Sequence, residues 1–293
     1  MKKTIKLISI ALCAALVLTV LYFVFGFFGN PLSYLLAKRS ASRYLEQNFG
    51  DSTFLVENVD YNFKTGSYYA RITDPTSQDS HFTVYFNGLG QYTYDTQDSI
   101  KYGYNTYSRV NQQYWDLVES VLYEGNGIIN CSISFGDLKT TEFEVFSYTT
   151  EDGQVEHYRM DKDYGLDFST LELDKEYDIL ALGRDYGRIC LYVHDPVVTV
   201  ERAAELLLEV KAYLDARNLP FHGIDFRLCE PRNEQGQMTG TQIDLYDFLY
   251  TDIYEAGLLD RVQAHWDAAK EHHAIQDSDK NHSDILNIIE VKE

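Results

Sequence analysis

The longest apolar segment of the chain is Leu7–Phe28, which contains twenty-two residues and no charge. Only Ser9, Cys13, Thr19 and Gly26 interrupt it. At about 1.5 Å of rise per residue, a helix of this length can cross the hydrocarbon layer of a bilayer, which is ~30 Å thick. The pattern therefore predicts one membrane-spanning helix, with the rest of the chain on one side of the membrane.

The charges that flank this segment predict its orientation. Three lysines precede it without any acidic residue, which is typical of an N-terminus that stays in the cytoplasm. The other side of the segment has nearly as many basic residues, since Lys38, Arg39 and Arg43 follow it within about 15 residues. We place the polar part outside the cell because a short basic N-terminus followed directly by an apolar segment is typical of exported chains.

A cleaved signal peptide and a lipoprotein are the alternative interpretations of this segment. The apolar core of a signal peptide has about 7–15 residues and ends at a small-x-small site. Here the apolar segment continues to Phe28, and Gly29-Asn30-Pro31 offers no good cleavage site. Cys13 is a poor site for lipid attachment because Leu12 before it is bulky. We favour an uncleaved anchor over residues 1–30.

The next part of the chain, residues 31–149, has the pattern of an α+β domain. A helix is expected over Leu35–Asn48. Alternation with a period of two then predicts strands, most clearly at His81–Phe86, where every second residue is apolar. The expected strands are Glu57–Phe63, Tyr68–Thr73, His81–Phe86 and Gln91–Tyr94. A helix followed by such a meander indicates an antiparallel sheet with the helix on one face.

The first domain is expected to end after one more helix and two more strands. Apolar residues at spacings of three and four predict a helix from about Asn105 to Gly125. Ile128–Phe135 and Glu142–Thr149 are expected to be strands. Residues 150–174 are rich in Asp, Glu and Gly, so we interpret them as an acidic linker or loop between two domains.

Residues 175–273 are predicted to form a second antiparallel α+β domain. Tyr177–Leu182 and Arg188–His194 flank a segment with two glycines, which indicates a hairpin. Thr199 can cap a helix, and strands are expected around Ile224–Leu228 and at Thr241–Phe248. A last helix over 252–272, bent at Gly257, would precede a disordered tail at 274–293 with a short ordered piece at 285–291.

The charge of the chain excludes some partners. The formal net charge is −20, and all 45 acidic residues follow the apolar segment. Such a surface argues against nucleic acid as a partner and against a domain that lies flat on anionic lipid. It is typical of a solvated surface, or of one that meets cationic partners.

Cysteines outside the apolar segment are sparse. Cys131, Cys190 and Cys229 contain no C-x-x-C spacing, so they predict neither a disulfide framework nor a zinc cluster. Cys190 and Cys229 can form a disulfide only if their strands are neighbours, which the sequence leaves open.

One acidic segment has features of a calcium loop. In Asp161–Glu172, acidic residues stand at loop positions one, three, seven and twelve. However, Leu166 stands where the sharp turn requires glycine, and Gly165 supplies no side-chain oxygen. A solvated acidic loop is the favoured interpretation, and calcium binding stays open.

Sequence motifs for catalysis are weak. His272-His273 lacks the spacing of a metal-binding pair, and the chain contains no G-x-S-x-G, phosphate-binding or dinucleotide-binding motif. We assign no catalytic, cofactor-binding or metal-ligating residue and expect that the chain is not an enzyme.

Tyrosine is abundant, with 24 residues. In alternating segments it is typical of amphipathic strands, half buried and half exposed. An aromatic binding patch for a peptide or glycan is the alternative, and it would draw on Tyr68, Tyr69, Tyr85, Tyr92, Tyr94 and Tyr104.

Several stretches of the first half resemble a known family. They are NP at 30–31 with LAKRSA at 36–41, VDYNFKTGSYY at 59–69, SHFTVY at 80–85 and GYNTYSR at 103–109. They are similar to the N-terminal region of the YfjL-like family, membrane-anchored proteins of Gram-positive bacteria without known activity. The likeness covers about residues 1–125, and residues 175–270 resemble the accompanying C-terminal domain more loosely. It implies one anchor and an extracytoplasmic α+β region, and it supplies no catalytic residues.

We therefore expect a single-pass cell-membrane protein whose extracytoplasmic part binds or modulates a protein partner at the cell envelope without catalysis. A peptidase-inhibitor-like or sensor domain is an alternative that rests only on the helix-and-meander layout. A hydrolase without a recognisable motif is the other alternative, and a pocket with two or more convergent ionisable groups would favour it.

Overall fold

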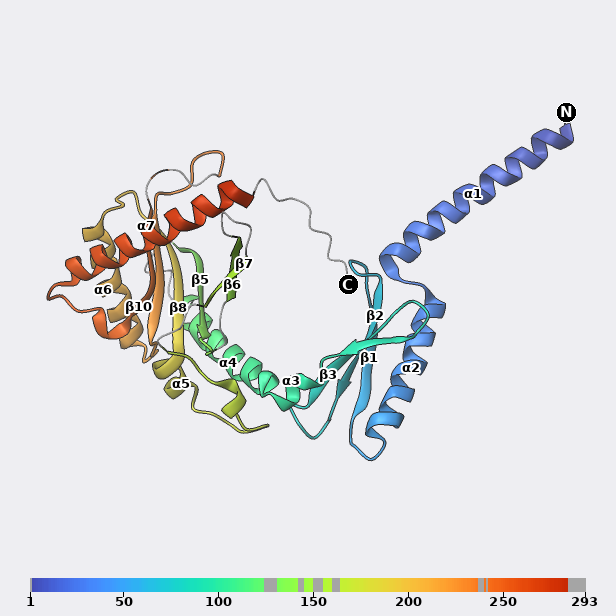
Figure 1. Ribbon diagram of the computed structural model, residues 1–293, viewed down its shortest axis with the longest axis horizontal. Coiled ribbons are helices and arrows are strands. Elements are labelled where there is room, and N and C mark those ends of the chain that lie inside the picture. Colours follow the sequence, from blue (N-terminus) through green and yellow to red (C-terminus); the bar gives the residue numbers. More distant parts are fainter. Residues whose placement is uncertain are drawn as a thin grey trace. The chain divides into compact units, whose positions relative to one another are not determined.

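The apolar N-terminal segment forms one long helix, α1 (Lys2–Phe28), in the computed structural model of the chain (Figure 1). All side chains from Leu12 to Phe28 are exposed. Among the residues that the structure describes, α1 opens the one helical stretch long and apolar enough to cross a membrane. A signal sequence near an N-terminus meets the same criterion. The structure describes residues 2–123, 131–141, 145–149, 155–159, 164–236, 240 and 242–283.

The chain divides into two units, which we describe separately. The first comprises Met1–Tyr107 with Ser169–Lys175, and the second comprises Ser108–Phe168 with Glu176–Glu293. The division therefore falls within helix α4 (Tyr104–Tyr123), whereas the sequence placed it at 150–174. The reason is pairing between distant segments. Strand β5 (Cys131–Leu138) joins β8 (Gly187–His194) in one sheet, and Asp174 donates its backbone N–H to Asp79 of the first unit at 2.9 Å.

The first unit is the predicted helix and meander. Asn30 caps α2 (Pro31–Phe49), because its side chain accepts from the N–H of Leu32 and Pro31 occupies the first helical turn. The antiparallel sheet has the order β1-β2-β3-β4. Its strands are β1 (Leu55–Asn62), β2 (Ser67–Thr73), β3 (His81–Phe86) and β4 (Tyr92–Asp95), followed by the short helix α3 (Asp98–Lys101).

The core of the first unit lies between α2 and the inner face of this sheet. Helix α2 contributes Ala37, Ala41 and Leu45, whose small or aliphatic side chains allow the helix to approach the strands closely. The strands contribute Val59, Tyr68, Ala70, Ile72, Phe82, Val84 and Phe86. The sequence-based expectation that Phe82, Val84 and Phe86 share one face is confirmed, since all three are buried.

The second unit contains a four-stranded sheet of order β10-β9-β8-β5. β9 (Gly223–Cys229) pairs in parallel with β8, and the remaining pairs are antiparallel, including the one with β10 (Gln242–Leu249). The sheet is therefore mixed, whereas two antiparallel sheets were expected. The α+β class is confirmed. The parallel pair arises because α6 (Val200–Ala216) carries the chain from the end of β8 back to the start of β9.

Other elements complete this unit. A separate hairpin consists of β6 (Val145–Thr149) and β7 (Val155–Arg159), and two short 3-10 turns lie at Phe168–Thr170 and Tyr250–Asp252. α7 (Leu258–Ser283) lies with α6 against the sheet (Figure 1). Gly257, with a φ of +69°, precedes α7 instead of bending it, and the helix continues past the expected end at His272. The expected piece at 285–291 lies outside the described residues.

The expected hairpin before β8 is wrong. Its first half is a helix, α5 (Ile179–Tyr186), which is capped by Asp178 through hydrogen bonds from the N–H groups of Leu180 and Ala181. Gly183, interpreted as a turn residue, instead allows close packing. A Cβ at this position would lie 2.5 Å from Cε2 of Tyr114 and 3.0 Å from the carbonyl oxygen of Pro220.

Candidate functional site

The outer face of the first sheet carries a row of tyrosines. Strand register places Tyr69 opposite Tyr85 and Tyr85 opposite Tyr94, with Asp60 beside Tyr69 on the edge strand. The rings of Tyr85 and Tyr94 stack at 4.2 Å between centroids, and those of Tyr69 and Tyr85 lie 5.9 Å apart. We call Tyr69, Tyr85 and Tyr94 the tyrosine row.

The tyrosine row differs from the patch that the sequence suggested. Tyr68 points into the core, whereas Tyr92 stacks on Tyr44 and donates its hydroxyl to Asp95 at 2.9 Å. Tyr104 begins α4 and lies outside the row. Tyr94 is 54% exposed at the edge of the sheet. The row therefore combines an exposed ring with half-buried rings, an arrangement that suits contact with a partner.

The second sheet also has two different faces. Every second residue of β8, β9 and β10 is buried on the face of α6 and α7, among them Leu191, Phe226 and Leu245. The opposite face carries charged, tyrosine and cysteine side chains. In register across the strands lie Asp137 opposite Arg188, Cys190 opposite Asp225, and Arg227 opposite Asp244.

Arg188 is the centre of a cluster of ionisable groups on that face. Its Nε donates to Oδ1 of Asp137 at 2.9 Å and its Nη1 donates to Oδ2 of Asp225 at 3.1 Å. A second bond to Asp137 completes a bidentate pair. Burial alone would lower the pKa of Arg188, but the bond and charge of Asp137, with the charge of Asp225, raise it. Arg188 therefore stays charged.

Asp247 holds the other half of the cluster. It lies where the pairing of β10 with β9 shifts between Leu245 and Phe248, and its φ of +52° is in the left-handed region. Its carboxylate forms an ion pair with Lys139 and accepts from the hydroxyl of Tyr164 at 2.9 Å. Burial is the main cause of the raised pKa of Tyr164, and the negative charge of Asp247 adds to it. We call Asp137, Lys139, Tyr164, Arg188, Asp225 and Asp247 the Arg188 cluster.

The Arg188 cluster is not visible in the sequence, because its six residues come from five separate segments. Packing supports their positions. A Cβ at Gly223 would lie 2.6 Å from the hydroxyl of Tyr164, so glycine is required there. The ring of Tyr164 also contacts His222 at 3.9 Å between centroids. Alternation along β8 and β9 was the one available signal, since Arg188 and Asp225 alternate with buried apolar residues of these strands.

Cys190 and Cys229 lie on neighbouring strands but form no disulfide. Register places Cys190 opposite Asp225 and Cys229 opposite His194, so the two thiols are four positions apart. Burial raises the pKa of Cys190 to about 11 and also raises the pKa of Cys229. Both groups are therefore thiols at neutral pH, the less nucleophilic form.

Within the acidic segment 161–172, residues 164–166 pack against the residues that follow β5. Leu166 is buried and its N–H donates to the carbonyl of Lys139 at 2.8 Å, while Gly165 lies too close to Thr140 for a side chain. Residues 161–163 lie outside the described part of the chain. Within the residues that are described, no group of three His, Cys, Asp or Glu side chains is arranged to hold a metal ion.

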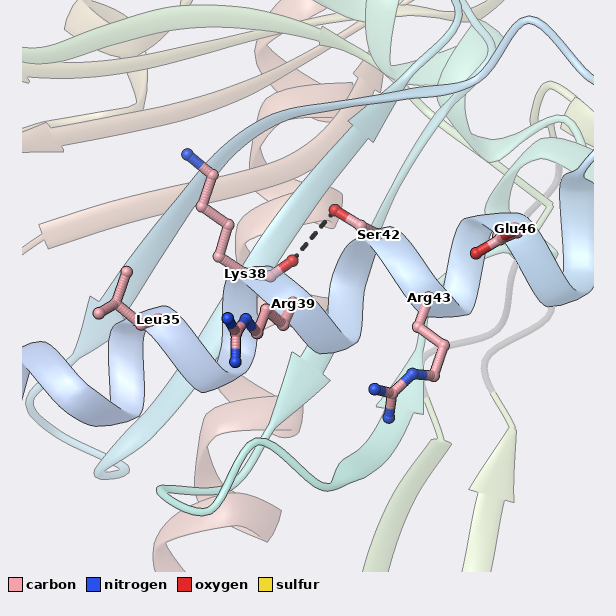
Figure 2. Close-up of a pocket in the computed structure, with 6 residues that line it drawn as sticks. All are labelled: Leu35, Lys38, Arg39, Ser42, Arg43 and Glu46. Carbon is pink, nitrogen blue, oxygen red and sulfur yellow. Dashed lines mark hydrogen bonds between the residues drawn. The ribbon is translucent and has the colours of Figure 1, made fainter.

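The outward face of α2 forms a shallow hollow of about 530 Å³ (Figure 2). It is lined by Leu35, Lys38, Arg39, Ser42, Arg43 and Glu46. The hydroxyl of Ser42 donates to the carbonyl oxygen of Lys38 at 3.2 Å, so this side chain is turned onto the helix. Three of the six residues are basic, on a chain that is strongly acidic overall.

Comparison with known proteins gives a family for both units. Residues 2–97 match the YfjL-like, N-terminal domain, and residues 141–263 match the YfjL-like C-terminal domain. The chain belongs to the YfjL-like family. Strand β5 lies between the two matched ranges, although it is part of the second sheet. Neither the curated proteins nor the solved structures contain a match.

Proposed function

We propose that this YfjL-like protein is a single-pass membrane protein that binds a protein partner outside the cell without catalysing a reaction. The observation that supports the anchor is the exposure of every side chain from Leu12 to Phe28. A helix that is apolar on all sides is stable in lipid and unfavourable in water. The three lysines before it favour a cytoplasmic N-terminus.

The tyrosine row is our proposed contact surface for the partner. Tyrosine rings are large and rigid, so they bury much apolar area at a small cost in side-chain entropy. The ring of Tyr85 stacks on Tyr94 and makes a tilted contact with Tyr69, and these contacts hold the rings in place before binding. Asp60 at one end of the row and the acidic chain as a whole favour a basic or uncharged segment of the partner.

The Arg188 cluster supports a role without catalysis. Convergent ionisable groups would favour a hydrolase, but here the carboxylates of Asp137, Asp225 and Asp247 are bound by Arg188 and Lys139. A general base needs a carboxylate that is available to a substrate proton. We propose that the cluster fixes the register of β5, β8, β9 and β10.

The anchor and its orientation are tested together. A reporter that functions only outside the cytoplasm, fused after residue 293, should be active, and the protein should stay in membranes after carbonate washing. Release by carbonate would contradict an uncleaved anchor. Activity of a reporter that functions only in the cytoplasm would show that the C-terminus lies in the cytoplasm, opposite to the proposed orientation.

The tyrosine row is tested by photo-crosslinking in intact cells. The crosslinker replaces Arg71, an exposed residue two positions from Tyr69 on β2 and therefore on the same face. A partner of this surface should give a crosslinked species that is lost in Y85A and Y94A. It should persist in Y102A, which removes an exposed tyrosine outside the row. Equal crosslinking in all three variants would overturn the assignment.

A further inference from the structure

The first unit is attached tightly to the end of α1. The hydroxyl of Tyr61 donates to the carbonyl oxygen of Gly26 at 3.0 Å. Tyr68 accepts from the N–H of Asn30 and donates to its carbonyl oxygen at 3.1 Å. A Cβ at Gly29, whose φ is +78°, would lie 2.8 Å from the ring of Tyr61. The sheet therefore begins directly where the apolar helix ends.

Two hairpin turns lie at this same end of the unit. Phe63, in the turn between β1 and β2, contacts the ring of Phe27 at 6.3 Å between centroids. In the turn between β3 and β4, Gly90 approaches Leu36 so closely that a Cβ would lie 2.9 Å from it. Each turn thus packs beside the junction of α1 and α2.

These turns carry large apolar side chains at their tips. Leu89 is 72% exposed and Phe63 is 57% exposed, and Leu32 in the first turn of α2 is 64% exposed. Turn tips usually carry small or polar residues because water surrounds them. Apolar tips grouped around the end of an apolar helix are the pattern of a surface that contacts an apolar phase.

A basic face lies next to these apolar tips. Lys38, Arg39 and Arg43 are exposed on α2 and line the same hollow (Figure 2), whereas Ala37 and Ala41 of this helix are buried. The Cα–Cβ bonds of a helix tilt toward its N-terminus, which here is the end that adjoins α1. Within the described part of the chain, none of the three cations forms an ion pair with a carboxylate.

The charges of the chain are also segregated along the sequence. No acidic residue precedes Glu46, although the chain contains 45 of them. The acidic surface that argues against lipid contact therefore belongs to later residues. The beginning of the first unit has the charge that complements phosphate groups.

We propose that this end of the first unit sits on the bilayer surface, on phospholipid headgroups that include anionic ones. We call it the headgroup face, and it consists of Leu32, Lys38, Arg39, Arg43, Phe63 and Leu89. Leu32, Phe63 and Leu89 enter the interfacial layer, while the basic side chains bind lipid phosphates. Aromatic and aliphatic side chains with nearby lysine or arginine are typical of interfacial segments. The inference rests on the proposed anchoring by α1.

The test uses the full chain in vesicles and tryptophan as the probe. L89W and F63W place tryptophan on the headgroup face. D51W places it beyond the C-terminal end of α2, about 28 Å along the helix from its N-terminal end. Trp115 and Trp266 give the same background in each variant. Lipids with a nitroxide on the headgroup should quench the added emission of L89W and F63W at least twofold more than that of D51W.

The basic residues are tested in the same vesicles. Phosphatidylglycerol in phosphatidylcholine vesicles should strengthen the quenching of L89W. The triple variant K38Q/R39Q/R43Q should abolish that increase, whereas K101Q, outside the headgroup face, should leave it intact. A response without dependence on lipid charge would overturn the phosphate contacts.

The outcomes separate this inference from the proposed anchor. A chain that stays in vesicles after carbonate washing but shows equal quenching at positions 51, 63 and 89 has an anchor and no headgroup contact. A chain that carbonate removes from vesicles lacks the anchor itself, which would overturn the proposed function together with this inference.

Discussion

The backbone N–H of Asp247 donates to Oδ1 of Asp225 at 2.8 Å. This bond lies at the point where β10 departs from regular pairing with β9. The carboxylate of Asp225 therefore holds the backbone of Asp247 in its left-handed conformation. Lys139, with a side chain only 5% exposed, then neutralises Asp247. The left-handed conformation of Asp247 thus depends on neighbours from two other segments.

Removal of the charge of Asp247 should leave Lys139 as a buried cation without its ion-pair partner. We expect D247N to lower the free energy of unfolding by roughly 1–3 kcal/mol, because asparagine keeps the left-handed conformation but not the charge. Denaturant unfolding measures this loss. The double variant K139M/D247N should lose less than the sum of the two single variants, since it contains no unpaired cation. Strict additivity would show that the pair contributes nothing specific.

Asp225 should make stability depend on pH in the direction opposite to most carboxylates. Burial raises its pKa, and the N–H of Asp247 and the charge of Arg188 offset this only in part. An acid whose pKa is raised on folding binds its proton more tightly in the folded state. Its contribution to stability is therefore largest below the ordinary carboxyl pKa and falls as the pH rises through the raised value.

Comparison with D225N isolates this contribution. Carboxylates outside the Arg188 cluster titrate equally in both proteins, so the difference in unfolding free energy between wild type and D225N reports on Asp225 and its contacts in the cluster. We expect the unfolding free energy of the wild type, relative to that of D225N, to decrease from about pH 4 upwards. An advantage that grows with pH would show that the Arg188 charge outweighs burial.

Gly183 should not tolerate a methyl group. In an exposed helix, alanine is more favourable than glycine by roughly 1 kcal/mol. Here the added Cβ would meet Tyr114 at 2.5 Å, so we expect G183A to lower stability by about 1–3 kcal/mol. A181G in the same helix is the matched control and should cost about 1 kcal/mol through helix propensity alone. Stabilisation by G183A would contradict the packing of α5 on α4.

Cys190 and Cys229 should react slowly with thiol reagents in the folded protein. Burial raises the pKa of both, so the thiolate that attacks such reagents is scarce at pH 7 to 8. We expect modification to accelerate at least tenfold when denaturant unfolds the protein. A difference in gel mobility between reduced and non-reduced protein would reveal a disulfide that this structure lacks.

The sequence by itself determined the elements whose signal is local. α1 follows from composition, α2 and the meander from periodicity, and α6 from the Thr199 cap with its stripe of Ala203, Leu207, Val210 and Leu214, all buried. Similarity of the residues between 30 and 109 determined the family. In α7, Val262 and Ala269 are buried, as the helical spacing predicts, whereas Leu259 is exposed and Leu258 is buried in its place.

Only the tertiary structure decided which strands are neighbours. Alternation with a period of two specifies which face a residue occupies, but the partner of a strand depends on contacts between distant segments. The pairing of β5 with β8, the parallel β8–β9 pair and the helix α5 in place of a hairpin all depend on such contacts. The tyrosine row and the Arg188 cluster exist only through strand register, so no single segment of the sequence contains either of them.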